Sequence, residues 1–128
     1  MSPQKKAGSI LDPTAEGLAT LNEVRLVGRV AAAPEEKELP SGDALCSVRL
    51  VVARDPAAAR RGGGRATSDW VVCTAWTPGL RRTLGRWREG DVVEVEGALR
   101  RRHYRVGAGA TSVVEIEVTG ARRVRRGE

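Results

Sequence analysis

The feature of this sequence that most constrains its fold is a period-two alternation of apolar and polar residues in five separate segments. Successive side chains of an extended strand point to opposite faces, so this alternation predicts strands with one buried face. The segments are residues 22–30, 44–54, 68–76, 92–104 and about 113–118. The fourth is the clearest, because its alternate positions are all apolar or glycine: Val93, Val95, Gly97 and Leu99.

One short helix is predicted between the third and fourth strands. Pro78 and Gly79 end the third strand, and an apolar stripe follows at spacings of four and three, formed by Leu80, Leu84 and Trp87. This spacing is typical of an amphipathic helix, which Gly90 is placed to end. The fold class is therefore predicted as all-β. Three strands, a helix and two strands in about 100 residues is the order of an OB-fold, a five-stranded Greek-key barrel that commonly binds oligonucleotides.

The remaining segments set the domain boundaries. The 128 residues are enough for one compact domain. Residues 1–20 are polar and lack periodicity, so we expect a flexible N-terminal extension, followed by the barrel at 21–122 and a basic C-terminal end at 123–128. Pro40, Ser41 and Gly42 predict a turn. Residues 55–67 contain Pro, three consecutive glycines and several arginines, and predict a long mobile loop.

The charge balance favours an anionic partner. Lys and Arg number 22 against 16 Asp and Glu, which gives a formal net charge of +6, and 19 of the 22 cations are arginine. A guanidinium binds phosphate with two hydrogen bonds and stacks on bases, so this bias suits nucleic acid. High-G+C coding would produce the same bias, and composition does not choose between the two explanations.

Two tryptophans of the third strand are the first candidates for contact with bases. Trp70 and Trp76 share one face of the strand, and Val71, Cys73 and Ala75 share the other. Small apolar residues suit the crowded interior of a narrow barrel, so the tryptophans are predicted to point outward. An exposed indole offers a stacking platform for a base. The alternative is a subunit interface or a covering loop that buries both rings.

Basic side chains accompany these aromatic residues. Tyr104 lies in the fourth strand on the same face as Arg100 and Arg102, so phosphate-binding groups would flank another platform. Trp87 is assigned to the core, because it lies on the apolar stripe of the helix. Electrostatics alone suggests further phosphate contacts from Arg25, Arg29, Arg49, Arg54, Arg60 and Arg61. For the loop arginines and for the basic stretch at the C-terminal end, the alternative is a solvated surface without a partner.

The sequence contains no arrangement typical of an enzyme or a cofactor site. Cys46 and Cys73 are 27 positions apart without a CxxC unit, and His103 is the single histidine, so neither a metal site nor a disulfide framework is expected. The glycines of residues 62–64 lack the Gly-Lys-Ser/Thr ending of a phosphate-binding loop. We therefore predict no catalytic residues, no cofactor, no metal and no membrane segment, in a reduced cytoplasmic compartment.

Several segments resemble the bacterial single-stranded DNA-binding proteins. Residues 21–50 are similar to the first two strands of that family, with its Asn-x-Val-x-Leu-Val-Gly start, Pro-Glu pair and Pro-x-Gly turn. SDWVVCTAW, residues 68–76, is similar to the third strand, and GDVVEVEGALRRRHY, residues 90–104, to the fourth. The likeness extends from residue 21 to about residue 124. Several motifs in the right order are far more specific than any one of them.

The resemblance implies a function and a set of site residues. It implies a homotetramer of OB domains that binds and protects single-stranded DNA in replication, recombination or repair, in the cytoplasm and associated with the nucleoid. Trp70, Trp76 and Tyr104 fall where the family has base-stacking aromatics. Arg100 and Arg102 match basic positions of its fourth strand.

The chain departs from the family pattern in three places. Asp55 and Pro56 occupy a position where the family usually has an aromatic residue, so one stacking site is expected to be lost. Val72 stands where a basic residue often occurs. The chain stops at Glu128 without the family's Gly/Pro/Gln-rich linker and acidic tail. DNA protection is therefore expected rather than tail-mediated recruitment of repair enzymes.

Three functions are compatible with these observations. The first is sequence-tolerant binding of single-stranded DNA by base stacking and arginine–phosphate contacts. The second is an RNA-binding OB protein, which would require contacts to the 2′-hydroxyl. The third is a protein-interaction module in which the tryptophans form an interface and the arginines only keep the chain soluble.

Overall fold

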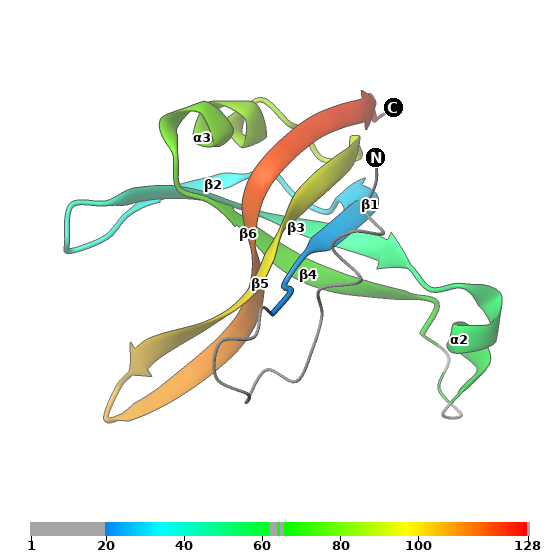
Figure 1. Cartoon of the computed structure of the whole chain (residues 1–128), viewed down its shortest axis with the longest axis horizontal. Coiled ribbons are helices and arrows are strands. Elements are labelled where there is room, and N and C mark those ends of the chain that lie inside the picture. The colour runs from blue at the N-terminus through cyan, green and yellow to red at the C-terminus, as the bar shows by residue number, and fades with distance from the viewer. Residues whose placement is uncertain (1–19, 62–63, 65, 128) are drawn as a thin grey trace.

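The computed structural model describes residues 20–61, 64 and 66–127 of the chain. Except for Thr20, the predicted N-terminal extension lies outside these described residues. The elements, shown in Figure 1, are β1 (Val24–Val30), β2 (Glu35–Glu38), β3 (Ala44–Ala53), α2 (Pro56–Arg60), β4 (Ser68–Ala75), α3 (Pro78–Gly85), β5 (Val92–Val106) and β6 (Gly109–Arg125).

The strands form one strongly curled sheet. Their order is β1-β5-β6-β4-β3-β2, and β1 also pairs with β3, with Arg29 opposite Val51 and Val30 opposite Leu50. The sheet therefore turns back on itself. β4 and β6 run parallel, and the other described pairs are antiparallel. A curled sheet of this topology with α3 between β4 and β5 is an OB-fold, as the element order predicted.

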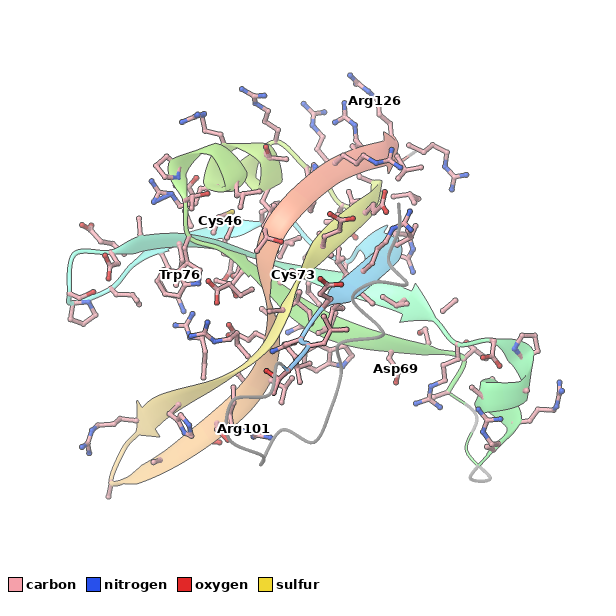
Figure 2. All side chains as sticks on the ribbon, viewed as in Figure 1. Cys46, Asp69, Cys73, Trp76, Arg101 and Arg126 are labelled. Carbon is pink, nitrogen blue, oxygen red and sulfur yellow. The ribbon has the colours of Figure 1, made fainter. Side chains whose placement is uncertain are left out.

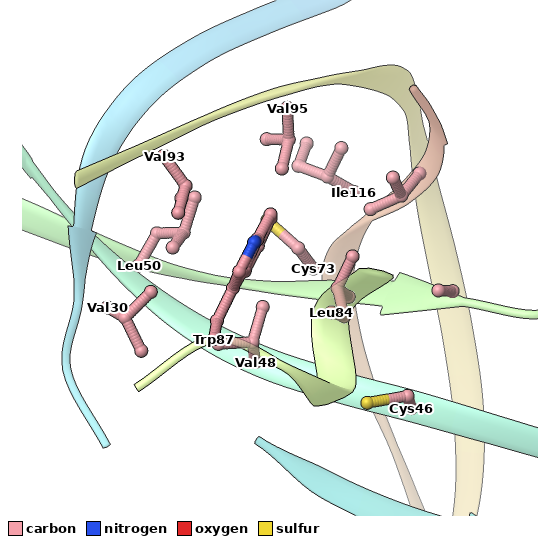
Figure 3. Close-up of a cluster of buried hydrophobic side chains, with 12 residues drawn as sticks. Val30, Cys46, Val48, Leu50, Cys73, Leu84, Trp87, Val93, Val95 and Ile116 are labelled. Atoms are coloured by element: carbon pink, nitrogen blue, oxygen red, sulfur yellow. The ribbon is translucent and has the colours of Figure 1, made fainter. Parts of the chain in front are cut away.

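The core lies inside the curl and is closed at one end by α3 (Figure 3). Leu84 of α3 is fully buried, and Trp87, just after the helix, is 4% exposed. The assignment of Trp87 to the core is thus confirmed. The strands contribute the alternate apolar residues of the sequence pattern, among them Val30, Val48, Leu50, Cys73, Val93, Val95 and Ile116. Within the described residues, no helix is both long and apolar enough to cross a membrane.

Two elements depart from the sequence-based expectation. The segment expected to be a long mobile loop contains the helix α2, because Asp55 accepts a hydrogen bond from the Ala58 N–H (2.7 Å) and Pro56 begins the helix. β2 was not predicted, since its residues are all charged and exposed and show no alternation. β2 forms because its backbone pairs with the edge of β3.

β5 and β6 form a hairpin longer than the sequence pattern indicated. The strands pair continuously to Val106 opposite Gly109, around a turn in which Gly107 has a φ of 58°. This arm extends away from the barrel (Figure 1). At its other end β6 continues to Arg125 rather than stopping near Val118. Three arginines at or just before the predicted basic C-terminal end therefore belong to the sheet and pair with the start of β5: Arg122, Arg123 and Arg125.

Candidate nucleic-acid interface

The outer face of the barrel at β4 carries the two tryptophans. Trp70 has 61% of its surface exposed, and Trp76, one residue past the end of β4, is partly buried. Cys73 and Ala75, on the opposite face of the strand, are fully buried in the core. The prediction that both tryptophans point outward is therefore confirmed.

Two hollows lie beside these rings. The larger, of about 540 Å³, crosses β3, β4 and β6 and has Trp70 and Arg49 in its walls. The smaller, of about 250 Å³, is lined by Trp76, Arg100, Arg102, Glu115 and Glu117. Arg102 and Glu115 border both hollows. The two hollows are therefore neighbouring parts of one surface, which we call the tryptophan groove.

Each tryptophan ring has a guanidinium over it. The Arg49 Cζ lies 4.4 Å from the centroid of the Trp70 ring, and the Arg102 Cζ lies 5.0 Å from that of Trp76. Arg49 comes from β3 and Arg102 from β5, so the two contacts depend on strands brought together by the fold. Cation–π attraction at such distances is worth about 0.5–1 kcal/mol at an exposed site.

A buried carboxylate lies beneath the groove. Glu115 is 5% exposed and accepts a hydrogen bond from the Thr74 hydroxyl at 3.0 Å. Its Oε1 is 3.6 Å from the Arg102 guanidinium. The carboxylate therefore lies beside the Arg102 guanidinium and offsets part of the positive charge at the centre of the groove.

The other candidates of the fourth predicted strand have different positions. Arg100 lines the smaller hollow and is paired with Glu117 at 2.6 Å. Tyr104 belongs to the β5 backbone, but its side chain lies outside the described part of the structure. The predicted stacking role of Tyr104 thus stays a prediction. Arg101, between Arg100 and Arg102, donates a hydrogen bond to the Ser112 hydroxyl at 3.0 Å.

Two other candidate arginines are engaged by acidic side chains. Arg25 of β1 pairs with Glu94, a buried carboxylate that Arg122 also contacts at 2.7 Å. The Arg25 hydrogen bond, offset in part by desolvation, lowers the pKa of Glu94. Arg54 forms two hydrogen bonds with the Asp69 carboxylate, at 2.9 and 2.8 Å. Neither Arg25 nor Arg54 lines the two hollows.

The last three candidates lie at the margins of the surface. Arg29 is exposed on β1 and pairs with Val51, which in turn pairs with Trp70. Two strand spacings, about 10 Å, therefore separate the Arg29 and Trp70 backbones. Arg60 and Arg61 are exposed at the end of α2, in the connection between β3 and β4. The structure thus brings Arg49, Arg100 and Arg102 to the tryptophan groove and leaves the other candidate arginines outside it.

Several groove residues were not singled out from the sequence. Val113 and Val114 of β6 are about 40% exposed and form an apolar wall of the larger hollow. Lys37 reaches the same hollow from β2. Two adjacent valines break the alternation of the fifth predicted strand, and this break in the pattern was the signal that could have found them. Lys37 had no such signal, because β2 itself shows no pattern.

The two cysteines are remote from any reactive role. Both are free and buried, and burial raises the pKa of Cys73 to about 12. A thiol with such a pKa is a poor nucleophile near neutral pH. Among the described residues, no three His, Cys, Asp or Glu side chains gather into a group that could hold a metal ion.

Fold and surface together define an OB-fold domain with tryptophans and arginines gathered on one outer face. The family model described as "Single-strand binding protein family" matches residues 21–124. The chain belongs to this family. The resemblance noted in the sequence is therefore confirmed.

Individual relatives agree with this assignment. Single-stranded DNA-binding protein B of Bacillus subtilis is 31% identical over 83 residues, which cover 65% of this chain and 71% of that protein. Single-stranded DNA-binding protein 3 of Listeria innocua is 29% identical over 84 residues, 66% of this chain and 51% of that protein. The chain thus spans about half the length of the Listeria relative.

A solved structure has the same fold. The Plasmodium falciparum SSB in complex with ssDNA superposes with a TM-score of 0.65 and 22% sequence identity, covering 84% of this chain and 96% of that one. At this identity the likeness supports the OB-fold.

Proposed function

We propose that this chain binds single-stranded DNA with little sequence preference, through bases stacked on Trp70 and Trp76 and phosphates bound by arginines. One observation carries the proposal: two indole rings lie on one outer face, each with a guanidinium over it, beside hollows that share Arg102 and Glu115. Every base has a π-face, so stacking of about 1–3 kcal/mol per base tolerates any sequence.

In this proposal, a base takes the place of each guanidinium. Arg49 and Arg102 occupy the space over the rings that a stacked base requires. The guanidinium therefore leaves the ring when the base arrives. It stays within reach of the backbone, where it can donate two parallel hydrogen bonds to a phosphate. The same arginine thus covers the ring in the free chain and contacts DNA in the complex.

The apolar walls of the groove favour the faces of bases over their edges. Val72, Val113 and Val114 line the larger hollow. Apolar side chains pack against base faces and offer no hydrogen bonds that would distinguish one base from another. Sequence-tolerant binding follows, with affinity that falls steeply as salt rises, because phosphate contacts release counterions.

We further propose that the chain acts as a homotetramer that protects single-stranded DNA in replication, recombination or repair. Apolar surface suited to contacts between copies is present: Val27 on β1 is 52% exposed and Leu99 on β5 is 50% exposed. The role requires no catalytic residue, cofactor or metal. It places the chain with DNA in the cytoplasm, associated with the nucleoid.

The test is the affinity for three oligonucleotides at low and high salt. We expect a labelled oligo-dT to bind tightly at low salt and more weakly at high salt, and duplex DNA to bind much more weakly throughout. Tighter binding of a matched oligo-rU would favour an RNA-binding OB protein. No binding to any oligonucleotide would overturn the proposal.

A variant distinguishes the remaining alternative. If the tryptophans were the core of a protein interface, Trp70→Ala with Trp76→Ala would dissociate the oligomer and leave any affinity for oligo-dT unchanged. We expect the reverse, with the oligomeric mass retained in sedimentation analysis and the affinity for oligo-dT lost.

A further inference from the structure

The excess positive charge of the chain lies outside the tryptophan groove. Residues 78–91 and 119–127 contain eight arginines and two acidic residues, an excess of six, which equals the formal net charge of +6 for the whole chain. Within the groove, by contrast, Arg100 is paired with Glu117, and Arg102 lies near Glu115. The groove therefore accounts for little of the charge that favours a polyanion.

The fold joins these two segments into one surface. Asp91, before β5, accepts hydrogen bonds from the backbone N–H groups of Arg88 (2.9 Å) and Gly127 (2.8 Å), and lies 3.8 Å from the Arg123 guanidinium. Gly127 packs so closely that an added Cβ would lie 2.4 Å from the Gly90 carbonyl carbon. The end of β6 is thus fixed beside the turn that follows α3.

The arginines at this junction divide into two groups. Arg122 and Arg123 are held by Glu94 and Asp91, and Arg81 donates a hydrogen bond to the Ala44 carbonyl at 3.2 Å. The others are exposed, and no carboxylate of the described residues lies within ion-pair distance of them. We call this second group the α3–β6 arginine surface: Arg82, Arg86, Arg88, Arg125 and Arg126.

The two surfaces face different sides of the barrel. Figure 2 shows Arg126 at the upper end of β6, with other long side chains fanning outward along α3, whereas Trp76 lies on the far side of the β2–β3 pair from α3. The one aromatic residue between α3 and β5, Trp87, is buried. This surface therefore offers no exposed aromatic ring to a base, and its guanidinium groups suit phosphate binding.

We infer that the α3–β6 arginine surface is a second binding surface for single-stranded DNA, which takes the phosphates of nucleotides that continue beyond the tryptophan groove. The inference rests on the proposed function. Arginines without a carboxylate within ion-pair distance leave positive charge largely uncompensated, and a chain of phosphates neutralises that charge while accepting bidentate hydrogen bonds. Such contacts are independent of base identity and add to the salt dependence of binding.

The test compares a short and a long oligo-dT. One of about 8 nucleotides lies within the range that a single OB-fold covers, and one of about 40 nucleotides extends well beyond it. The variant is Arg86→Gln, Arg125→Gln and Arg126→Gln combined, and the control changes the same three positions to Lys, which keeps the charge. Thermal unfolding of both variants checks that the fold is intact.

We expect the Gln variant to bind the short oligonucleotide as the wild type does. With the long one, its affinity should fall by about tenfold at moderate salt, and the slope of log K against log salt should decrease by about two, because each lost contact with a single strand removes about 0.7. The Lys variant should keep the wild-type slope.

Two results would overturn the inference. One is a Gln variant that binds the long oligo-dT with wild-type affinity and slope. If the wild type binds poly-glutamate and this variant does not, the surface binds an acidic protein segment instead of DNA. The other is an equal loss for both lengths, which would place these arginines at the primary site. Failure of the proposed function is distinguishable from failure of this inference, because in the first case the wild type itself does not bind the short oligo-dT.

Discussion

Trp70 offers the more exposed indole to a base, because 61% of the residue's surface is exposed and it has no role in the core. Replacing it with Ala should weaken binding of a short oligo-dT by roughly 5- to 150-fold, the equivalent of about 1–3 kcal/mol for one stacked base. Fluorescence anisotropy of a labelled oligonucleotide measures this. The melting temperature should stay within about 2 °C of wild type, since no core packing is lost.

The matched control is the buried tryptophan. Trp87→Ala removes a side chain that is 4% exposed and should destabilise the fold by about 3–5 kcal/mol. If Trp70→Ala instead lowered the melting temperature as much as Trp87→Ala, Trp70 would be a structural residue, contrary to its position here.

We expect Arg49 to contact a DNA phosphate in the complex and to lie over the Trp70 ring in the free chain. Arg49→Met keeps an unbranched chain of similar reach but removes the guanidinium that lies 4.4 Å from the Trp70 ring. We expect the salt slope for oligo-dT to decrease by about 0.7, the value for one phosphate contact with a single strand. An unchanged slope would show that Arg49 does not reach a phosphate in the complex.

Asp91 should make the free energy of unfolding depend on pH in the acid range. The backbone N–H groups of Gly127 and Arg88 hold the pKa of Asp91 below its ordinary value of 3.8. A carboxyl group with a lowered native pKa contributes stability that is present above the unfolded value and is lost as pH falls through the native value. Urea unfolding should therefore show Asp91→Asn to be less stable than wild type at pH 7, with a difference that shrinks at pH 3. A difference independent of pH would contradict this role.

At the scale of elements, the bend of β5 over β6 requires Gly97. An added Cβ there would lie 2.0 Å from the Glu117 carbonyl oxygen, next to a shift in the register between the two strands. Gly97→Ala should cost about 1–3 kcal/mol or more in the free energy of unfolding, because backbone has to move. Gly64→Ala is the control, since nothing lies within 4 Å of that position. Equal unfolding midpoints in urea would contradict the close approach.

The elements that could be predicted are those whose pattern comes from burial. β1, β3, β4 and the first half of β5 each have one face in the core, so their apolar residues alternate. β2 and the outer part of the β5–β6 hairpin have little core contact, and backbone pairing alone determines them. α2 depends on the cap formed by Asp55, a local signal that the glycines and arginines after it concealed.

At the scale of the whole molecule, the candidate site was predictable only in part. The outward direction of Trp70 and Trp76 follows from the parity of one strand. The arginines over them come from β3 and β5, and which arginine meets which ring depends on the register between strands, which the sequence does not contain. The α3–β6 arginine surface likewise depends on contacts between segments distant in the sequence, such as the hydrogen bond from the Gly127 N–H to Asp91.

Stacking of bases on Trp70 and Trp76 would quench their fluorescence, so a fluorescence titration measures it. The wild type and a variant with Trp70→Phe and Trp76→Phe would be titrated with oligo-dT while anisotropy of a label on the oligonucleotide reports binding independently. We predict strong quenching in the wild type and none in the variant, whose remaining Trp87 is buried, although the variant still binds through its phenyl rings. Quenching that persists in the variant, or binding by the wild type without quenching, would contradict the account.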